Sequence, residues 1–338
     1  MSQTPDHDGL GLNQAKSTKR DRFTQGKAHA SRGPLKRLFF GAHGLRAGWG
    51  LLLFVLFAAL NFAVFLVVVA IIARAHGHFP AGGAHPRKLD LKRMSPAILA
   101  ISEGVMLASF MLATVVMGWI ERRPLASLGF DLRGLPLRFV QGLLAGLSLL
   151  AALVASLWLV HAVSFGPVVW RGWSAVAGGL QWGGVFLLVA GFEEVALRGY
   201  LLQTLARGLN FRWAAVISSA LFMALHISNG GETLFGLSQV FVIGLVFCLS
   251  VWKTGALWWA IGYHAAWDWA QSFLFGVADS GESISGALMT ARPIGPAWLS
   301  GGTTGPEGSA LALAAIAATA ALIVLTLKKP DHVLPVRW

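Results

Sequence analysis

The chain has 338 residues, of which 55% are hydrophobic and only 12% are charged, and its mean hydropathy is +0.64. A soluble domain of this length carries about a quarter charged residues, so the composition excludes an ordinary soluble protein. The net charge of +12 comes mostly from Lys and Arg that lie in the first 46 residues or flank apolar segments. This pattern favours contact with membrane lipids over nucleic-acid binding.

The chain begins with a polar segment and continues with repeated apolar runs. Residues 1–46 are basic and lack hydrophobic periodicity, which predicts a disordered cytoplasmic tail. The later runs approach the 20 or so residues that a helix needs to cross a bilayer, and they are continuous rather than alternating. The sequence therefore predicts an all-α, polytopic transmembrane helix bundle. About eight spans are expected, at 48–73, 96–120, 138–163, 177–205, 213–228, 234–252, 255–275 and 309–327.

The predicted spans divide the chain into five parts. These are the tail (1–46), the first three spans (47–176), a core of the fourth to seventh spans (177–275), a loop (276–308), and the last helix with a short tail (309–338). With both termini in the cytoplasm, 19 Lys and Arg lie in cytoplasmic segments and seven outside, the basic loop 74–95 being the main exception. We expect a multi-pass protein of a bacterial plasma membrane with cytoplasmic termini.

Two pairs of glycines within spans are candidate packing sites. Gly142 and Gly146 lie four residues apart in the third span, and Gly179 and Gly183 do so in the fourth. Small residues at this spacing would let two helix backbones approach each other closely.

The fourth span contains the most unusual charges, in the sequence GFEEVALRGY. An ionisable residue within a span is a functional candidate, because its burial is costly unless it is paired or faces water. Glu194 and Arg198 are four residues apart and can pair on one helix face, while Glu193 is turned about 100° away. This spacing predicts a structural Glu194–Arg198 pair and a Glu193 that is free to act. The alternative is an ion-pair trio at the membrane surface.

Two later spans carry histidines. His264 and Asp268 repeat the four-residue spacing in HAAWDW, where the aspartate could orient the histidine or share a metal ion with it. An interfacial aromatic belt with a polar pair is the alternative. His226 ends the fifth span in FMALH, one turn after Phe222, and alone it would suit a packing role. One Glu, two His and a supporting Asp on three helices form a set that can hold or activate water.

Other polar groups give weaker signals. Glu103 and His161 lie near the ends of their spans, where solvation is easier, and we expect structural roles for both. The sequence contains neither a G-x-S-x-G nucleophile motif nor the zinc motif H-E-x-x-H. Serine-triad and zincin chemistry are therefore not favoured.

The ordered motifs EEVALR, FMALH and HAAWD resemble those of the CAAX protease and bacteriocin-processing family, also called the CPBP or Abi family. The resemblance covers about residues 177–275. It implies an all-helical intramembrane endopeptidase that acts on membrane-associated or prenylated proteins or peptides. By the same resemblance Glu193 would activate the attacking water and His226 would assist it. His264 with Asp268 would stabilise the oxyanion, and Glu194, Arg198 and Phe222 would support the site.

The resemblance leaves the use of a metal open. Glu193, His226, His264 and Asp268 could together hold a divalent ion such as zinc, or Glu193 could act as a base without one. Asp268 departs from the family pattern, in which prenyl-protein members have asparagine, and an ionised aspartate cannot donate a hydrogen bond to an oxyanion.

Two other functions fit the same residues. A non-catalytic immunity or scaffold protein would keep the fold without needing Glu193. A proton- or metal-coupled transporter would use the intramembrane Glu, His and Asp as a relay.

Overall fold

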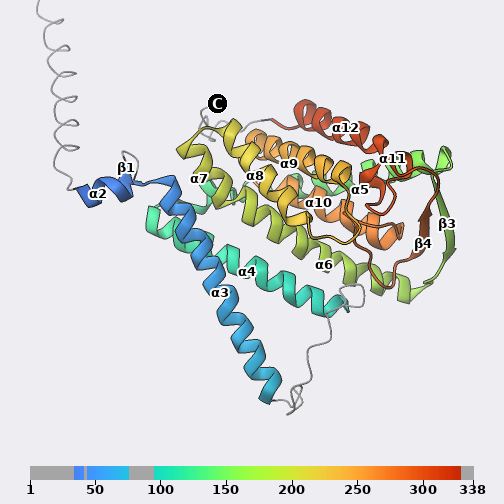
Figure 1. Cartoon of the computed structure of the whole chain (residues 1–338), viewed down its shortest axis with the longest axis horizontal. Coiled ribbons are helices and arrows are strands. Elements are labelled where there is room, and N and C mark those ends of the chain that lie inside the picture. The colour runs from blue at the N-terminus through green and yellow to red at the C-terminus, as the bar shows by residue number, and fades with distance from the viewer. Residues whose placement is uncertain (1–33, 42–43, 76–94, 329–338) are drawn as a thin grey trace, which may run out of the picture. The chain divides into compact units, whose positions relative to one another are not determined.

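The computed structural model describes residues 34–41, 44–75 and 95–328, which fall into two compact units, Met1–Gly50 and Leu51–Trp338 (Figure 1). The first unit contains the short helix α2 (Pro34–Phe39) and the antiparallel pair β1 (Phe40–Gly41) and β2 (Gly44–Leu45). The indole of Trp49 donates to Leu38 O at 3.2 Å, and its ring packs at a tilt against that of Phe39, with 4.7 Å between the ring centres. The last part of the predicted tail thus has secondary structure, and residues 1–33 lie outside the described residues.

The chain is an integral membrane protein with an all-α, polytopic fold, as predicted. Among the residues that the structure describes, five helical stretches are long and apolar enough to cross a membrane, at Ala47–Ile71, Pro96–Glu121, Leu135–Leu159, Trp173–Gly208 and Leu234–Thr254. The helices that coincide with the eight predicted spans are α3 (Ala47–Ala75), α4 (Pro96–Glu121), α5 (Leu135–Leu159), α6 (Trp173–Arg198) with α7 (Tyr200–Gly208), α8 (Phe211–His226), α9 (Leu234–Thr254), α10 (Trp258–Trp269) and α12 (Ala310–Thr326). Three of them, α8, α10 and α12, are too short to count among the five.

Three local features differ from the predicted spans. The fourth span is broken at Gly199 between α6 and α7, and the seventh ends in a single π-helical segment, η3 (Ala270–Leu274). The segment expected to be a loop, 276–308, contains β4 (Met289–Pro293), the short helix α11 (Ala297–Ser300) and η4 (Pro306–Gly308). Strand β4 pairs antiparallel with β3 (Val163–Val168), which follows α5. Residues 76–94 of the predicted basic loop lie outside the described residues.

Helix α10 lies against α5 and α6, and α8 lies against α9 (Figure 1). The contact between α5 and α10 depends on glycine. A side chain at Gly142 or Gly146 would collide with the backbone carbonyl of Trp259 or Tyr263, and one at Gly262 would collide with that of Phe139. Only glycine permits this approach of two backbones, so the predicted packing role of Gly142 and Gly146 is confirmed. The seam fixes the register of α10 and therefore the position of its functional side chains.

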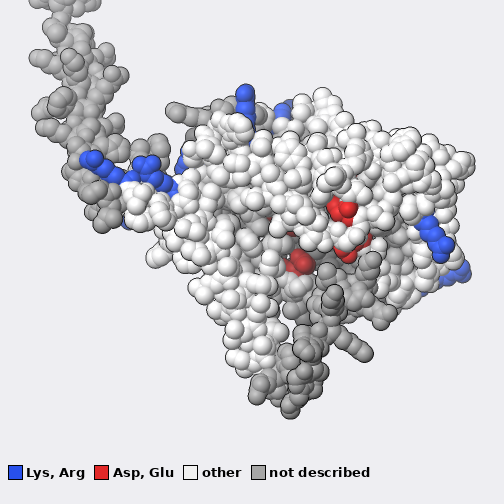
Figure 2. Space-filling model, viewed as in Figure 1, with Lys and Arg blue, Asp and Glu red and all other residues white. Residues whose placement is uncertain are grey.

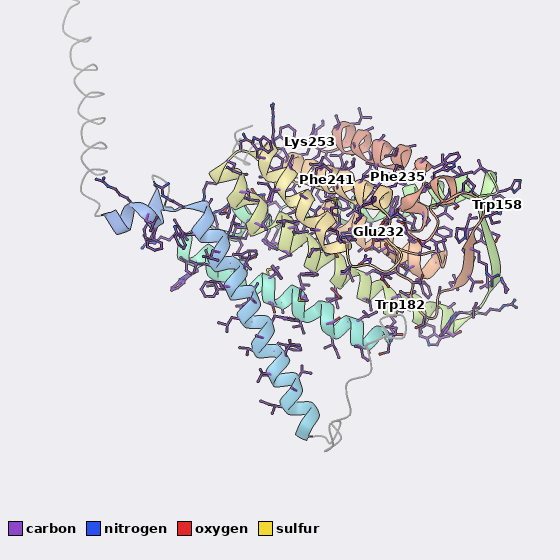
Figure 3. All side chains as sticks on the ribbon, viewed as in Figure 1. Trp158, Trp182, Glu232, Phe235, Phe241 and Lys253 are labelled. Carbon is purple, nitrogen blue, oxygen red and sulfur yellow. The ribbon has the colours of Figure 1, made fainter. Side chains whose placement is uncertain are left out.

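Side-chain caps set where helices α8 and α9 begin. The side chain of Asn210 accepts from Trp213 N at the start of α8, and Thr233 accepts from Gly236 N at the start of α9. Such caps satisfy a backbone donor that the first turn of a helix leaves free. Figure 3 shows Glu232 just before α9 and Lys253 in its last turn, so these two residues mark the ends of the helix.

One end of the second unit is held by a charged network around Glu121, whose side chain is 2% exposed. Its carboxylate accepts from Tyr200 Oη at 2.8 Å and pairs with Arg207 at 2.8 Å and Arg123 at 3.4 Å. Arg123 also donates to the Thr204 hydroxyl at 3.1 Å. This network ties the end of α4 to α7.

Candidate active site

Helix α6 places two adjacent carboxylates in different surroundings. The carboxylate of Glu194 lies 3.0 Å from Arg198 Nη1, and both side chains are fully buried. The predicted pair is therefore present, on one face of the last turns of α6. Glu193 lies on another face and lines a cavity. The two glutamates thus differ as their spacing predicts, one neutralised by arginine and one facing open space.

Aromatic rings and a backbone carbonyl complete the environment of Arg198. Its guanidinium lies 4.4 Å from the centre of the Phe222 ring and 5.5 Å from that of Phe247. Arg198 Nη2 also reaches Gly244 O at 3.5 Å. Cation–π contacts of this kind help to offset the desolvation of a buried cation. The Phe222 ring therefore packs against Arg198 and helps to hold the Glu194–Arg198 pair in place.

His264 on α10 is surrounded by carboxylates. Its Nε2 lies 3.5 Å from Glu193 Oε2 and 3.4 Å from Asp268 Oδ2, and its Nδ1 lies 3.4 Å from Glu194 Oε1. These separations are longer than good hydrogen bonds, so they are charge contacts that small movements could tighten. The imidazole stacks on Phe247 at 5.3 Å between ring centres. His264 is thus the residue that joins both parts of the EE motif to α10.

His226, at the end of α8, is fixed by its own helix. Its Nδ1 lies 2.8 Å from Phe222 O. Because a carbonyl oxygen can only accept, Nδ1 carries the hydrogen, and Nε2 of the neutral ring is left as an acceptor. His226 lines the same cavity as Glu193 and His264.

The cavity has a volume of about 190 Å³ and is mostly apolar in its lining. Glu193, His226, His264 and Asp268 all line it, so the structure brings the four predicted residues together. The predicted site residues come from the fourth, fifth and seventh spans, but two further helices complete the cavity. Helix α9 contributes Gln239, Val240, Ile243 and Phe247, and α12 contributes Ala312 and Ile316.

Sequence reasoning missed three further carboxylates that line this cavity, Asp279, Glu282 and Glu307. They come from the segment after α10, which was predicted only as a loop. Burial raises the pKa of Asp279 well above its usual value, and the nearby carboxylates of Asp268 and Glu307 raise it further. The available signal was the presence of acidic residues in DSGES and GPEG, in a chain with only 15 Asp and Glu in total.

The two polar residues expected to be structural have different positions. His161 is exposed just after the last turn of α5 and has a positive φ of 57°. Glu103 lies on α4, which packs against α6, the helix that carries Glu193.

The side chains do not fit the zinc set that the sequence left open. Among the described residues, no group of three or more His, Cys, Asp and Glu side chains is arranged to hold a metal ion. One ring nitrogen of His226 is already bonded to its own helix, and both ring nitrogens of His264 face carboxylates.

Comparison with known proteins gives one match. Residues 175–270 match the family model described as type II CAAX prenyl endopeptidase Rce1-like. This segment runs from the start of α6 to the end of α10 and contains all the predicted site residues, so the predicted resemblance to the CAAX protease family is confirmed. Neither the curated proteins nor the solved structures provide a match.

Proposed function

We propose that this chain, whose residues 175–270 form an Rce1-like core, is an intramembrane endopeptidase that hydrolyses peptide bonds of membrane-associated or prenylated, CAAX-type proteins or peptides. The observation that most directly supports this function is the convergence of Glu193, His226 and His264. They come from three different helices and line one cavity large enough for water and a short stretch of peptide. The exposed apolar surface of α3, which includes Val55, Leu60 and Val64, fits a protein whose substrates also reside in the membrane.

Glu193 is the proposed general base. Its carboxylate takes a proton from water while the water oxygen attacks the carbonyl carbon of the scissile bond. The same proton then passes to the amide nitrogen, the C–N bond breaks, and the carboxylate is restored. Base catalysis of this kind contributes about 10²–10⁴-fold to the rate. The apolar walls strengthen each charge interaction in the cavity, since few water dipoles can screen it.

The two histidines have different proposed roles. Nε2 of His226 accepts a hydrogen bond from the attacking water and orients it, because Nδ1 is occupied by Phe222 O. His264 donates a ring N–H to the oxyanion that forms on the carbonyl oxygen. Asp268, 3.4 Å from Nε2, keeps that ring in place, which is a role that an ionised carboxylate can fill by accepting alone.

Replacing Glu193 with glutamine tests the assignment. We expect kcat on a lipid-anchored, internally quenched peptide in proteoliposomes to fall by about 10³-fold, because glutamine cannot take a proton. The melting temperature in detergent should stay near that of the wild type. Glu232→Gln is a matched control, since this carboxylate lies just before α9 and does not line the cavity (Figure 3). Full activity in the Glu193 variant would rule out its role as the base.

Two further measurements separate this function from its rivals. Cleavage should persist in chelator, and loss of activity that added zinc restores would contradict a metal-free base. A scaffold protein would retain its cellular effect after Glu193→Gln without cleaving any peptide. A transporter would show counterflow in the same proteoliposomes.

The proposal includes an orientation in a bacterial plasma membrane with both termini in the cytoplasm. Single cysteines introduced near either end of the chain should react with an impermeant reagent only after the membrane is opened. Labelling of intact cells would place the termini outside the cytoplasm and would contradict this orientation.

A further inference from the structure

One end of the cavity is built from segments that follow the family match. Asp279 and Glu282 lie in the stretch after α10, and Glu307 lies in η4. Neutral groups hold each carboxylate: the Ser272 hydroxyl donates to Asp279 at 3.0 Å, Gly230 N donates to Glu282 at 2.8 Å, and the Trp267 indole donates to Glu307 at 2.8 Å. Ser280 adds two further bonds to Glu307, from its backbone N at 3.0 Å and its hydroxyl at 2.9 Å. These donors fix the three side chains in position without bringing a countercharge.

The charge around this end of the cavity is strongly one-sided. Five carboxylates line the cavity, and the lining contains no Lys or Arg among the described residues, only the two histidines. Figure 2 shows acidic side chains grouped on one face of the second unit, with the Lys and Arg of that unit lying away from them. Walls of low dielectric concentrate the field of such a group, so the cavity attracts a cation although the chain as a whole is basic.

A second observation, independent of the carboxylates, indicates a missing donor. Gln239 on α9 is 2% exposed and lines the cavity. Its Nε2 donates to Ser309 O at 3.1 Å, which places the amide beside the end of η4, two residues after Glu307. Its Oε1 has no hydrogen-bond partner in the structure. A buried carbonyl oxygen without a donor is costly, so a ligand that brings an N–H group to this point would be favoured.

We infer that this end of the cavity is a cation subsite, formed by Asp279, Glu282, Glu307 and Gln239, that receives a Lys or Arg side chain of the substrate peptide. The inference rests on the proposed function and adds a specificity to it. The carboxylates are not grouped as metal ligands among the described residues, which favours an organic cation with several N–H donors over a metal ion. The subsite would place a basic residue of the substrate a few residues from the scissile bond.

The experiment compares lipid-anchored peptides that carry Lys or Met at one position at a time. Lys and Met have flexible stems of similar length, so the pair isolates the charge. At one position we expect wild-type kcat/KM to be about tenfold higher for the Lys peptide. In Asp279→Asn/Glu282→Gln the ratio should fall below about twofold. Gln239→Leu should reduce the ratio to a smaller extent, because it removes one neutral acceptor.

A binding measurement keeps the inference separate from the proposed function. Fluorescently labelled Lys and Met peptides are titrated against Glu193→Gln protein in nanodiscs, with and without the Asp279→Asn/Glu282→Gln changes. About tenfold tighter binding of the Lys peptide, lost in the combined variant, supports the subsite even if no peptide is cleaved. Equal binding of both peptides, or a preference that survives the combined variant, overturns it. Cleavage of Lys and Met peptides at equal rates would overturn the subsite and leave the peptidase standing.

Discussion

The protein contains two buried polar sites, and the negative charge of their carboxylates is balanced in different ways. At the end of α4, Glu121 is bound by Arg123, Arg207 and the Tyr200 hydroxyl, so each of its oxygens has a close partner. Around α10, three carboxylates share the single imidazole of His264, and only Glu194 has an arginine. Glu121 in the first group and Glu194 in the second are both buried. The first satisfies its charges internally and joins two helices, whereas the second leaves acceptor atoms free for water and substrate.

The largest loss of stability should follow from removing the arginine of the second group. Arg198→Met leaves the fully buried charge of Glu194 without its partner, and breaking a buried pair in this way costs about 3–5 kcal/mol. We expect a marked fall in melting temperature in detergent. The double variant Glu194→Gln/Arg198→Met should lose less, because no uncompensated charge remains. Equal losses in the two variants would mean that packing, rather than charge, holds this turn of α6.

A smaller loss of stability is expected when Glu121, at the first site, is changed. Glu121→Gln leaves Arg123 and Arg207 facing each other, but both are partly exposed, at 16% and 25%, so water can solvate them. We expect a destabilisation of about 1–3 kcal/mol, in the range for a lost buried hydrogen-bonding group. The folded fraction should cleave peptide at the wild-type rate, as measured by active-site titration. A selective loss of kcat would show that the network acts on the active site rather than only on the fold.

The smallest expected effect is on the pH dependence of stability, through Asp279 in the segment after α10. Because the pKa of Asp279 is raised in the folded protein, the folded state binds this proton more tightly than the unfolded state. The contribution of Asp279 to stability is therefore fully present at low pH. It is lost as the pH rises from the ordinary aspartate range through the raised folded pKa.

Asp279→Asn removes this titration, so the variant should gain stability relative to the wild type as the pH increases. Melting temperatures measured from about pH 4 to about pH 8 test the trend, since the raised titration falls above the ordinary aspartate value of about 3.9. Parallel curves for the two proteins would contradict it.

The parts of the structure that depend on local spacing could be predicted from the sequence. Apolar runs located the helices, and the four-residue intervals located the pairs Glu194–Arg198 and His264–Asp268. The glycine spacing in α5 indicated a close helix contact, although it could not name α10 as the partner.

The remaining features depend on contacts between residues far apart in the chain. From the sequence, Gln239 is an ordinary polar residue in an apolar helix. Its role depends on the contact with Ser309 O, between η4 and α12, and on the cavity that it lines. The pairing of β3 with β4 joins segments more than 100 residues apart, and neither has a strong strand pattern. The break between α6 and α7 follows from the backbone conformation of Gly199, whose ψ is −120°, and no local motif predicted it.

The glycine seam between α5 and α10 has a mechanical consequence for an enzyme in a bilayer. The backbones of α5 and α10 are in contact from Phe139 to Gly146 of α5, so the two helices cannot slide past each other without separating. We expect them to respond to a thinner or thicker membrane by tilting as one rigid unit. The distance of His264 from either end of that unit stays constant when the lipid changes. Under the proposed function, membrane thickness would then determine which peptide bond of an anchored substrate reaches the imidazole.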